Sequence, residues 1–351
     1  MKIAHILWGL ENGGTENMLV DILYYQAQTD NQISLYVINN LINNSILKRI
    51  PKNIKLHFYH KKVGSKNPLP ILRLNLDLFK EKADIIHLHM PNLKKWIFVK
   101  SHYVRTIHSC MCTNEDYNKM DLLIAISDAV KNVTIKQIDS SNVITITNGI
   151  RIDLIKQKKN FRHSGESLNI IQVSRLFHEI KGQDLVLQSL LKIKNKYPDA
   201  KIHYTMVGGG PSFEYLNGLV MKYELSSWVT FLGDQTREYV YSHLKSYDLY
   251  LQASRDEGFG LTIAEGMAAK LPVLISELEG PMEVIGYGKY GLTFKTNDAE
   301  NLAEMIWKIY NSDIDTRIID SAFNFVNLHY DVKITSEMYC KVYKKILDSV
   351  C

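Results

Sequence analysis

Short apolar runs recur along the chain, and each is bounded by polar or glycine-containing segments. In the first half these runs predict buried strands over 3–8, 33–37, 54–58, 85–89, 103–107 and 122–126. Segments with helical spacing separate them. This strand and helix alternation predicts an α/β fold with a largely parallel sheet.

A second series of the same kind follows residue 167. Its expected strands are 168–173, 203–207, 229–232, 248–252 and 273–275. The polar segment 156–167 lies between the two series and is expected to be a linker. We therefore expect an N-terminal domain over 1–155 and a C-terminal domain over 168–331. The apolar positions between Val332 and Leu347 have helical spacing and predict a further helix.

Two carboxylates frame a glycine-containing loop in the second series. Glu257 and Glu265 bound the stretch EGFGLTIAE, which lies between the expected strands 248–252 and 273–275. Gly258 and Gly260 allow the backbone to approach a ligand closely. The free N–H groups at the start of a helix near Leu261 favour an anion. The stretch therefore predicts a nucleotide-sugar site.

This stretch resembles the E-x7-E signature of GT4, a family of retaining glycosyltransferases. The resemblance covers nearly the whole chain and implies the GT-B fold: two facing Rossmann-like domains with mostly parallel sheets and a central cleft. It also implies that a C-terminal helix over about 332–351 packs back on the N-terminal, acceptor-side domain. Ser174 stands where the family usually has Gly. Further matching elements are Ser174-Arg175-Leu176 with Lys181-Gly182, Met206 to Pro211, Val229 to Gly233, Gly13-Gly14-Thr15-Glu16 and Asn148-Gly149-Ile150.

The resemblance implies roles for the charged residues. Arg175 and Lys181 hold the donor diphosphate, Glu257 faces the donor sugar, and Glu265 accepts hydrogen bonds from the ribose. A guanidinium forks two hydrogen bonds to phosphate oxygens and an ammonium is a compact charge, so a bound metal is not required. The other expected donor-binding residues are Gly14, Gly258, Phe259, Gly260 and Leu261.

Histidines of the N-terminal half allow more than one interpretation. His108, after the strand 103–107, resembles the active-site histidine of the family, although a histidine at a strand end also serves structure alone. His87 and His89 alternate along one strand and so share a face, but the sequence shows no third ligand for a metal. We expect His89 to be an acceptor-side residue only. Gly14 approaches the donor or simply forms a turn.

The composition agrees with a two-domain enzyme. The chain has 351 residues, 46% of them hydrophobic, and a net charge of +5 that does not by itself indicate nucleic acid as a partner. Four cysteines, Cys110, Cys112, Cys340 and Cys351, lack the spacing of a structural zinc site. No apolar run reaches the roughly 18 residues that span a bilayer, so we expect a cytoplasmic protein.

Two basic segments of the first half, 60–66 and 94–100, stand out. The second mixes lysines with Trp96 and Phe98, as membrane-surface segments do. This pattern favours peripheral contact with the inner membrane and a lipid-linked acceptor. The alternative is an ordinary half-buried helix with a solvated edge, because a clean amphipathic period is missing.

These observations predict a retaining, metal-independent hexosyltransferase that needs no cofactor. It moves a sugar from a nucleotide diphosphate sugar to a saccharide hydroxyl in bacterial surface polysaccharide synthesis, such as that of O-antigen, capsule or exopolysaccharide. Two alternatives remain: a nucleotide-sugar epimerase of related fold, and a non-catalytic carbohydrate- or nucleotide-binding protein.

Overall fold

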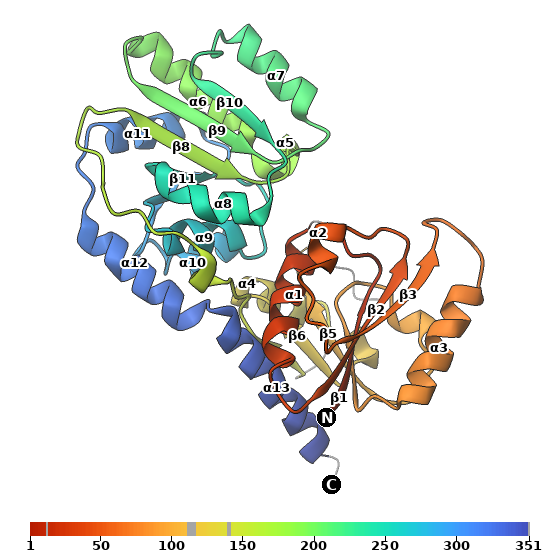
Figure 1. Ribbon diagram of the computed structural model, residues 1–351. Coiled ribbons are helices and arrows are strands. Elements are labelled where there is room, and N and C mark those ends of the chain that lie inside the picture. The colour runs from red at the N-terminus through yellow and green to blue at the C-terminus, as the bar shows by residue number, and fades with distance from the viewer. Residues whose placement is uncertain (12, 111–116, 139–141, 350–351) are drawn as a thin grey trace. The chain divides into compact units, whose positions relative to one another are not determined.

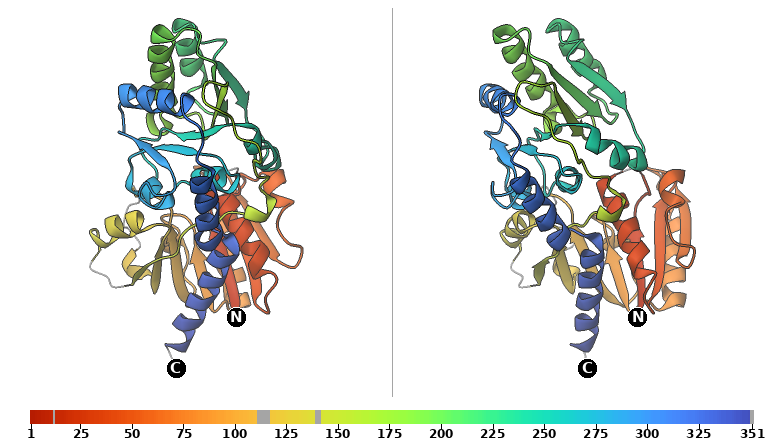
Figure 2. Two further views of the ribbon diagram at one scale, coloured as in Figure 1. Left: turned by 90° about the vertical axis from the view of Figure 1, so that its left-hand side faces the viewer. Right: turned by 60° about the vertical axis from the view of Figure 1, so that its left-hand side comes forward.

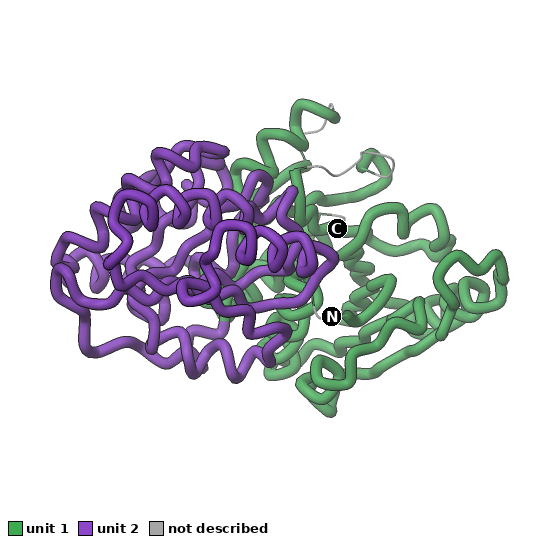
Figure 3. Tube along the Cα trace, turned by 90° about the horizontal axis from the view of Figure 1, so that it is seen from above, with its two compact units in different colours: residues 1–150, 330–351 green, residues 151–329 purple. Residues whose placement is uncertain are grey.

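The computed structural model describes residues 1–11, 13–110, 117–138 and 142–349. The chain forms two compact units, shown in separate colours in Figure 3. Unit 1 comprises residues 1–150 and 330–351, and unit 2 comprises residues 151–329. Among the described residues, no helix combines the length and apolar character needed to cross a membrane.

Unit 1 is built on a parallel sheet in the order β3-β2-β1-β4-β5-β6-β7 (Figure 1). Its strands are β1 (Lys2–Leu7), β2 (Gln32–Asn39), β3 (Lys55–Lys61), β4 (Ile85–Leu88), β5 (His102–Ile107), β6 (Leu122–Ala125) and β7 (Val143–Thr145). Its helices are α1 (Gly14–Gln26), α2 (Asn44–Leu47), α3 (Leu69–Glu81), α4 (Asp128–Ile135) and α13 (Val332–Asp348), with short 3-10 turns η1 (Lys94–Trp96) and η2 (Tyr117–Lys119). The strand order reverses between β1 and β4, as in a Rossmann-like fold.

The helix α13 follows unit 2 in the chain but belongs to unit 1, where Figure 1 shows it in dark blue beside α1. Ser336 Oγ donates to the carbonyl oxygen of Ile22 in α1 at 3.4 Å. A backbone bridge between Ile150 and Asp331 leads into the helix. Two buried tyrosines of α13, Tyr339 and Tyr343, turn their hydroxyls toward the sheet. The helix therefore completes the core of unit 1.

Unit 2 repeats the architecture with a parallel sheet in the order β10-β9-β8-β11-β12-β13. Its strands are β8 (Leu168–Val173), β9 (Ile202–Val207), β10 (Val229–Gly233), β11 (Leu249–Gln252), β12 (Val273–Ser276) and β13 (Leu292–Phe294). Its helices are α5 (His178–Lys181), α6 (Gln183–Lys196), α7 (Phe213–Lys222), α8 (Arg237–His243), α9 (Leu261–Ala268), α10 (Glu279–Val284), α11 (Ala299–Tyr310) and α12 (Thr316–His329), with 3-10 turns η3 (Ile152–Leu154) and η4 (Leu244–Ser246). Figure 2 shows this layering of helices and sheet from two further directions.

The predicted α/β fold class is confirmed. The apolar runs became strands because they are buried on both faces: Ile170 and Leu251 at the centre of the unit 2 sheet are fully inaccessible to solvent. The sequence did not indicate β7 and β13, which have three residues each. Such short segments lack a periodic signal of their own.

The segment 156–167, expected as a linker, differs from that expectation because it packs on unit 2. Lys158 Nζ donates to Asp248 Oδ1 at 3.0 Å, and both side chains are 9% exposed. The Arg162 guanidinium donates to the carbonyl oxygens of Ile309 at 3.0 Å and Tyr310 at 2.6 Å. The polar side chains that suggested a solvated linker are thus paired with partners far away in the sequence.

Candidate functional site

The loops that carry the predicted donor-site residues emerge at one edge of the unit 2 sheet. The strand order reverses between β8 and β11, so a crevice is expected outside the carboxyl ends of these two strands. The chain segments here touch backbone to backbone: a Cβ on Gly182 would lie 1.9 Å from Ala253 O, and one on Gly208 would lie 2.2 Å from Ser174 O. Glycine is therefore required at both positions.

Lys181 and Glu257 form an ion pair at this edge. The distance from Lys181 Nζ to Glu257 Oε2 is 2.6 Å, and the side chains are 23% and 21% exposed. Arg175 lies nearby in sequence, after β8, and is exposed. Within the described ranges, no hydrogen bond or ion pair holds its guanidinium, so that cation is available to an anion from solution.

Glutamine side chains fix the loop that carries these cations. Gln183 Nε2 donates to Ser174 Oγ and to Arg175 O, both at 3.0 Å. Gln172 Nε2 donates to Lys181 O at 2.9 Å. Ser174, which replaces the usual family glycine, is accommodated because its hydroxyl accepts one of these hydrogen bonds.

A second ion pair anchors the loop that carries Glu257. Arg255 Nη1 and Nη2 donate to the two carboxylate oxygens of Asp184 at 2.8 and 2.9 Å, and Nη1 also donates to His178 O at 2.6 Å. This bidentate pair raises the pKa of Arg255 above its usual value. Arg255 therefore ties the loop after β11 to α5 and α6. Sequence reasoning did not identify it, because nothing local marks Asp184 as its partner.

The helix α9 begins directly after the glycine-containing loop. Gly260 has φ of +109°, a left-handed conformation that favours glycine, and no described side chain caps the first turn. The N–H groups of that turn, near Leu261, therefore remain available to an anion. Phe259 is only 1% exposed and anchors the loop in the core. Gly258 is also buried.

Glu265 lies within α9, about one turn beyond its start. Its Oε1 accepts a hydrogen bond of 2.8 Å from the hydroxyl of Tyr241 in α8. This partner was not anticipated from the sequence. It holds one carboxylate oxygen in place, which suits a residue that must present an acceptor to paired hydroxyls.

The remaining predicted residues, Gly14 and His108, belong to unit 1. Gly14 is exposed and is the first residue of α1. His108 follows β5 and is half-buried, and its Nε2 has no hydrogen-bond partner among the described residues. Burial and the positive charge of Arg105 lower the pKa of His108 to about 4, so the ring is neutral at pH 7. Their donor-site roles remain predictions.

His87 and His89 have a third histidine beside them, contrary to the sequence interpretation. The register of β1 and β4 pairs His5 with His87. One ring nitrogen from each of the three residues lies within 4.8 Å of the others, and all three side chains are buried. The sequence does not predict this cluster, because His5 lies on β1 and comes close to His87 only through the pairing of β1 with β4.

These ring nitrogens are mostly committed to hydrogen bonds. His5 bonds His89 at 2.9 Å and Gln26 at 2.8 Å, while His87 bonds Thr106 at 2.8 Å and Tyr343 at 2.5 Å. Burial lowers the pKa of all three histidines, that of His5 to about 4. We therefore interpret the cluster as a neutral hydrogen-bonded network. Cys340 is a half-buried thiol of α13, and Cys112 and Cys351 lie outside the described residues.

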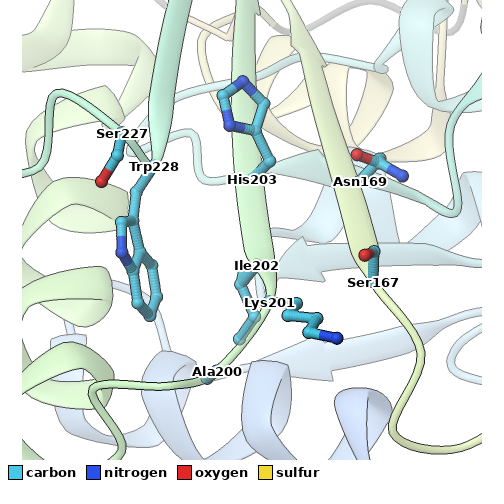
Figure 4. A pocket seen from close by; sticks show the side chains of 8 residues that line it. All are labelled: Ser167, Asn169, Ala200, Lys201, Ile202, His203, Ser227 and Trp228. Atoms are coloured by element: carbon cyan, nitrogen blue, oxygen red, sulfur yellow. The ribbon is translucent and has the colours of Figure 1, made fainter.

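A small pocket opens at the opposite edge of the unit 2 sheet (Figure 4). It lies at the amino ends of β8, β9 and β10 and includes Asn169, His203 and Trp228. None of the predicted donor-site residues lines it. The chemistry of unit 2 therefore concentrates at the carboxyl ends of the strands, away from this pocket.

Two Rossmann-like units, one with cations gathered at its strand-order reversal, define the architecture of GT-B glycosyltransferases. A family model described as glycosyl transferases group 1 matches residues 154–323, which is most of unit 2. This part of the chain is therefore similar to the glycosyl transferases of group 1.

Individual relatives are similar over much of the chain. An uncharacterized glycosyltransferase of Methanocaldococcus jannaschii is 25% identical over 242 residues, which cover 66% of this chain and 60% of the relative. The N-acetyl-alpha-D-glucosaminyl L-malate synthase of Bacillus anthracis is 28% identical over 252 residues, covering 64% of this chain and 65% of the relative. The chain thus spans less than two thirds of the length of either.

A solved structure matches both units. That of Anabaena Alr3699/HepE in complex with UDP and glucose has a TM-score of 0.78 and 20% identity, and it covers 98% of this chain and 99% of the other. At this identity the likeness shows the fold alone.

Proposed function

We propose that this glycosyltransferase moves a sugar from a nucleotide diphosphate sugar to a saccharide hydroxyl with retention of configuration. The observation that carries the proposal is the ion pair between Lys181 and Glu257 at the strand-order reversal of unit 2, together with the exposed Arg175 in the loop after β8. It joins two cations suited to a diphosphate with a carboxylate suited to a sugar. The UDP and glucose bound by Alr3699/HepE support a UDP-sugar as the first donor to test.

The diphosphate would lie against Arg175, Lys181 and the start of α9. Arg175 offers two parallel N–H donors, and the helix start offers backbone N–H groups. Glu265, held by Tyr241, would accept the ribose hydroxyls. Negative charge grows on the departing phosphate as the glycosidic bond breaks, so the same cations stabilise the transition state more than the ground state.

The transfer breaks the bond between the anomeric carbon and the phosphate oxygen and forms one to the acceptor oxygen on the same face. The acceptor proton passes to the departing phosphate. Glu257 favours the partial positive charge of the sugar and forms no covalent intermediate. On this proposal, the cations of the chain take the place of a metal.

The proposed acceptor is a saccharide carried on a lipid, as in the assembly of O-antigen, capsule or exopolysaccharide. The enzyme would then act in the cytoplasm at the inner face of the membrane. The basic segments 60–66 and 94–100 of unit 1 support this assignment.

Donor binding and turnover test the proposal together. We would measure thermal stabilisation by UDP-, GDP-, TDP- and CMP-sugars and then hydrolysis of any sugar that binds. One donor should stabilise the protein and be turned over slowly, and both Glu257→Gln and Arg175→Ala should lose turnover. The Lys192–Glu300 pair has the same 2.6 Å length but lies on the surface, so Glu300→Gln is the matched control.

The outcome also separates the alternatives. A nucleotide-sugar epimerase would return an isomerised donor and release no free sugar. A binding protein would be stabilised without any turnover, even with acceptor present. The anomeric configuration of the product, followed by NMR, tests retention, and activity in EDTA tests independence from metal.

A further inference from the structure

The helix α3 of unit 1 carries two apolar faces. One face packs against the sheet through Ile71, Leu74 and Leu78, which are buried. The other face, which we name the apolar stripe, is open to solvent. It consists of Leu69, Leu72, Leu76 and Phe79, which are 56%, 51%, 57% and 68% exposed.

The spacing of these four residues aligns them. They follow one another at intervals of three, four and three positions, so with about 100° of rotation per residue they form one row along the helix. Isolated exposed leucines are ordinary, but a contiguous row of large apolar side chains marks an interaction surface. Figure 1 shows α3 in orange beside β3, at one end of the unit 1 sheet.

A neighbouring segment extends the row. Asn75 of α3 donates to Trp96 O at 2.9 Å and accepts from Phe98 N at 2.7 Å, which fastens the segment after η1 to the helix. Trp96 is 41% exposed and Phe98 is 74% exposed. Two aromatic side chains therefore stand beside the apolar stripe.

Cations border the stripe. Arg73 and Lys80 are exposed and each follows a stripe residue by four positions, which places it next to that residue on the helix surface. Lys62 and Lys66, in the loop before α3, and Lys100 are exposed as well. The border is therefore positively charged.

The carboxylates of α3 have partners in β2 and β3. Asp77 accepts a hydrogen bond of 2.9 Å from Tyr59, and Glu81 accepts from Ser34 and Tyr36. These partners lie in the sheet on which α3 packs. The contacts therefore hold both carboxylates toward the sheet, although the Asp77 side chain is still 37% exposed, while the exposed Arg73 and Lys80 border the stripe.

We propose that the apolar stripe, with Trp96 and Phe98, docks unit 1 on the surface of a bilayer that contains anionic lipid. Aliphatic and aromatic side chains would enter the boundary between headgroups and acyl chains, and the bordering cations would meet lipid phosphates. Tryptophan favours that boundary in particular. The inference rests on the proposed function and deepens it, since it names the surface at which a lipid-carried acceptor would be met.

Co-sedimentation with lipid vesicles tests the docking. The probes are vesicles of phosphatidylcholine alone and of phosphatidylcholine mixed with phosphatidylglycerol. The full chain should bind the mixed vesicles, and the triple variant Leu72→Gln, Leu76→Gln, Phe79→Gln should partition at least about tenfold less, because each side chain would lose most of its apolar burial. The pair Arg73→Gln, Lys80→Gln should lose mainly the preference for phosphatidylglycerol.

Matched controls lie in unit 2. Leu328 and Met221 are 69% and 65% exposed, and Leu328→Gln with Met221→Gln should leave vesicle binding unchanged. Binding of the triple variant equal to that of the unaltered chain would overturn the proposal. So would a chain that ignores vesicles but forms dimers that the triple variant abolishes, since the stripe would then join two copies.

Failure of the docking and failure of the proposed function are distinguishable. The stripe residues are not donor-site residues, so the triple variant should hydrolyse a soluble nucleotide sugar at the unaltered rate. Loss of vesicle binding with donor hydrolysis retained supports the docking alone. Absence of donor hydrolysis in the unaltered chain, with vesicle binding intact, contradicts the proposed function alone.

Discussion

Lys181 Nζ lies 2.6 Å from Glu257 Oε2, so the lysine proposed to meet the donor diphosphate also contacts the carboxylate proposed to face the donor sugar. The two roles are therefore coupled. On the proposed roles, a diphosphate at Lys181 would compete with Glu257 for the ammonium. A lysine that turned to the phosphate would release Glu257 toward the sugar.

This coupling makes Glu257→Gln informative. We expect turnover to fall about 100-fold or more, because the variant loses charge stabilisation of the transition state. UDP should bind as tightly as before or more tightly, since Lys181 no longer has a charged competitor. Calorimetry and initial rates measure the two effects. Weakened UDP binding in this variant would show that the pair stabilises the site instead of competing with the ligand.

Arg175→Ala should weaken the binding of the donor in addition to its effect on turnover. The exposed guanidinium is expected to make charge-assisted hydrogen bonds to the diphosphate, whose loss costs about 1.5–3 kcal/mol, or roughly 10- to 150-fold in affinity. The melting temperature without ligand should not change. Arg317, exposed on α12, provides the control variant Arg317→Ala. Unaltered UDP affinity in Arg175→Ala would remove Arg175 from the site.

Much of the fold could be predicted from the sequence, and the side-chain partners that could not be predicted have one feature in common. Strands such as β8 and β11 are largely apolar, and the Glu257 to Glu265 stretch is a local motif. Arg255, Tyr241 and His5 act through partners that are distant in the sequence. Local patterns carry no information about such pairs, which arise only when the strands are in register.

The segment 156–167 shows the same limit, whereas the helix α3 shows a different one. Lys158 looked like part of a solvated linker because its buried partner Asp248 lies 90 positions away. The three-four-three spacing of the apolar stripe, in contrast, is visible in the sequence. The sequence does not show which of the two apolar rows of this helix is buried, because that depends on the sheet against which the helix packs.

Arg255→Gln should destabilise the protein. It would leave the carboxylate of Asp184, which is 7% exposed, without its bidentate partner. The cost for a fully buried pair is about 3–5 kcal/mol, and the 25% exposure of the Arg255 side chain reduces it to about 2 kcal/mol. Urea unfolding measures the change. An unaltered unfolding midpoint would mean that the ion pair between Arg255 and Asp184 contributes no stability.

Two glycine variants should have opposite effects. Gly182→Ala places a Cβ 1.9 Å from Ala253 O at φ of +66°, so it should cost about 2 kcal/mol or more. Gly218 lies inside α7, and a Cβ added there would have no neighbouring atom within 4 Å, so Gly218→Ala should stabilise the protein by up to about 1 kcal/mol. Thermal unfolding compares them. A tolerated alanine at position 182 would contradict the close approach of the two loops.

The histidine network predicts a pH dependence. Burial lowers the pKa of His5 to about 4, whereas an unfolded histidine titrates near 6.5. As the pH falls from about 6.5 toward 4, His5 binds a proton in the unfolded chain but stays neutral in the folded chain. The free energy of unfolding should therefore fall over this range, by at most about 1.4 kcal/mol per pH unit for each such histidine.

The variant His5→Gln should reduce the slope of the free energy of unfolding against pH by the contribution of about one proton. The exposed His243 is the matched position, and His243→Gln should leave the slope unchanged. Denaturant unfolding at several pH values between neutral and mildly acidic measures the three slopes. Equal slopes for the unaltered chain and His5→Gln would show that His5 takes up its proton while folded.

The place of α13 in unit 1 has a consequence for biosynthesis. Unit 2 is continuous from 151 to 329, so it can fold as soon as it leaves the ribosome. Unit 1 begins earlier but lacks Tyr339 and Tyr343 until the segment after residue 330 emerges. His87 and Thr106 therefore lack these two hydrogen-bond partners until unit 2 has been translated. The half of the protein that is made first is therefore finished last, and a nascent chain that has emerged only as far as residue 329 would carry a complete unit 2 and a unit 1 sheet without α13.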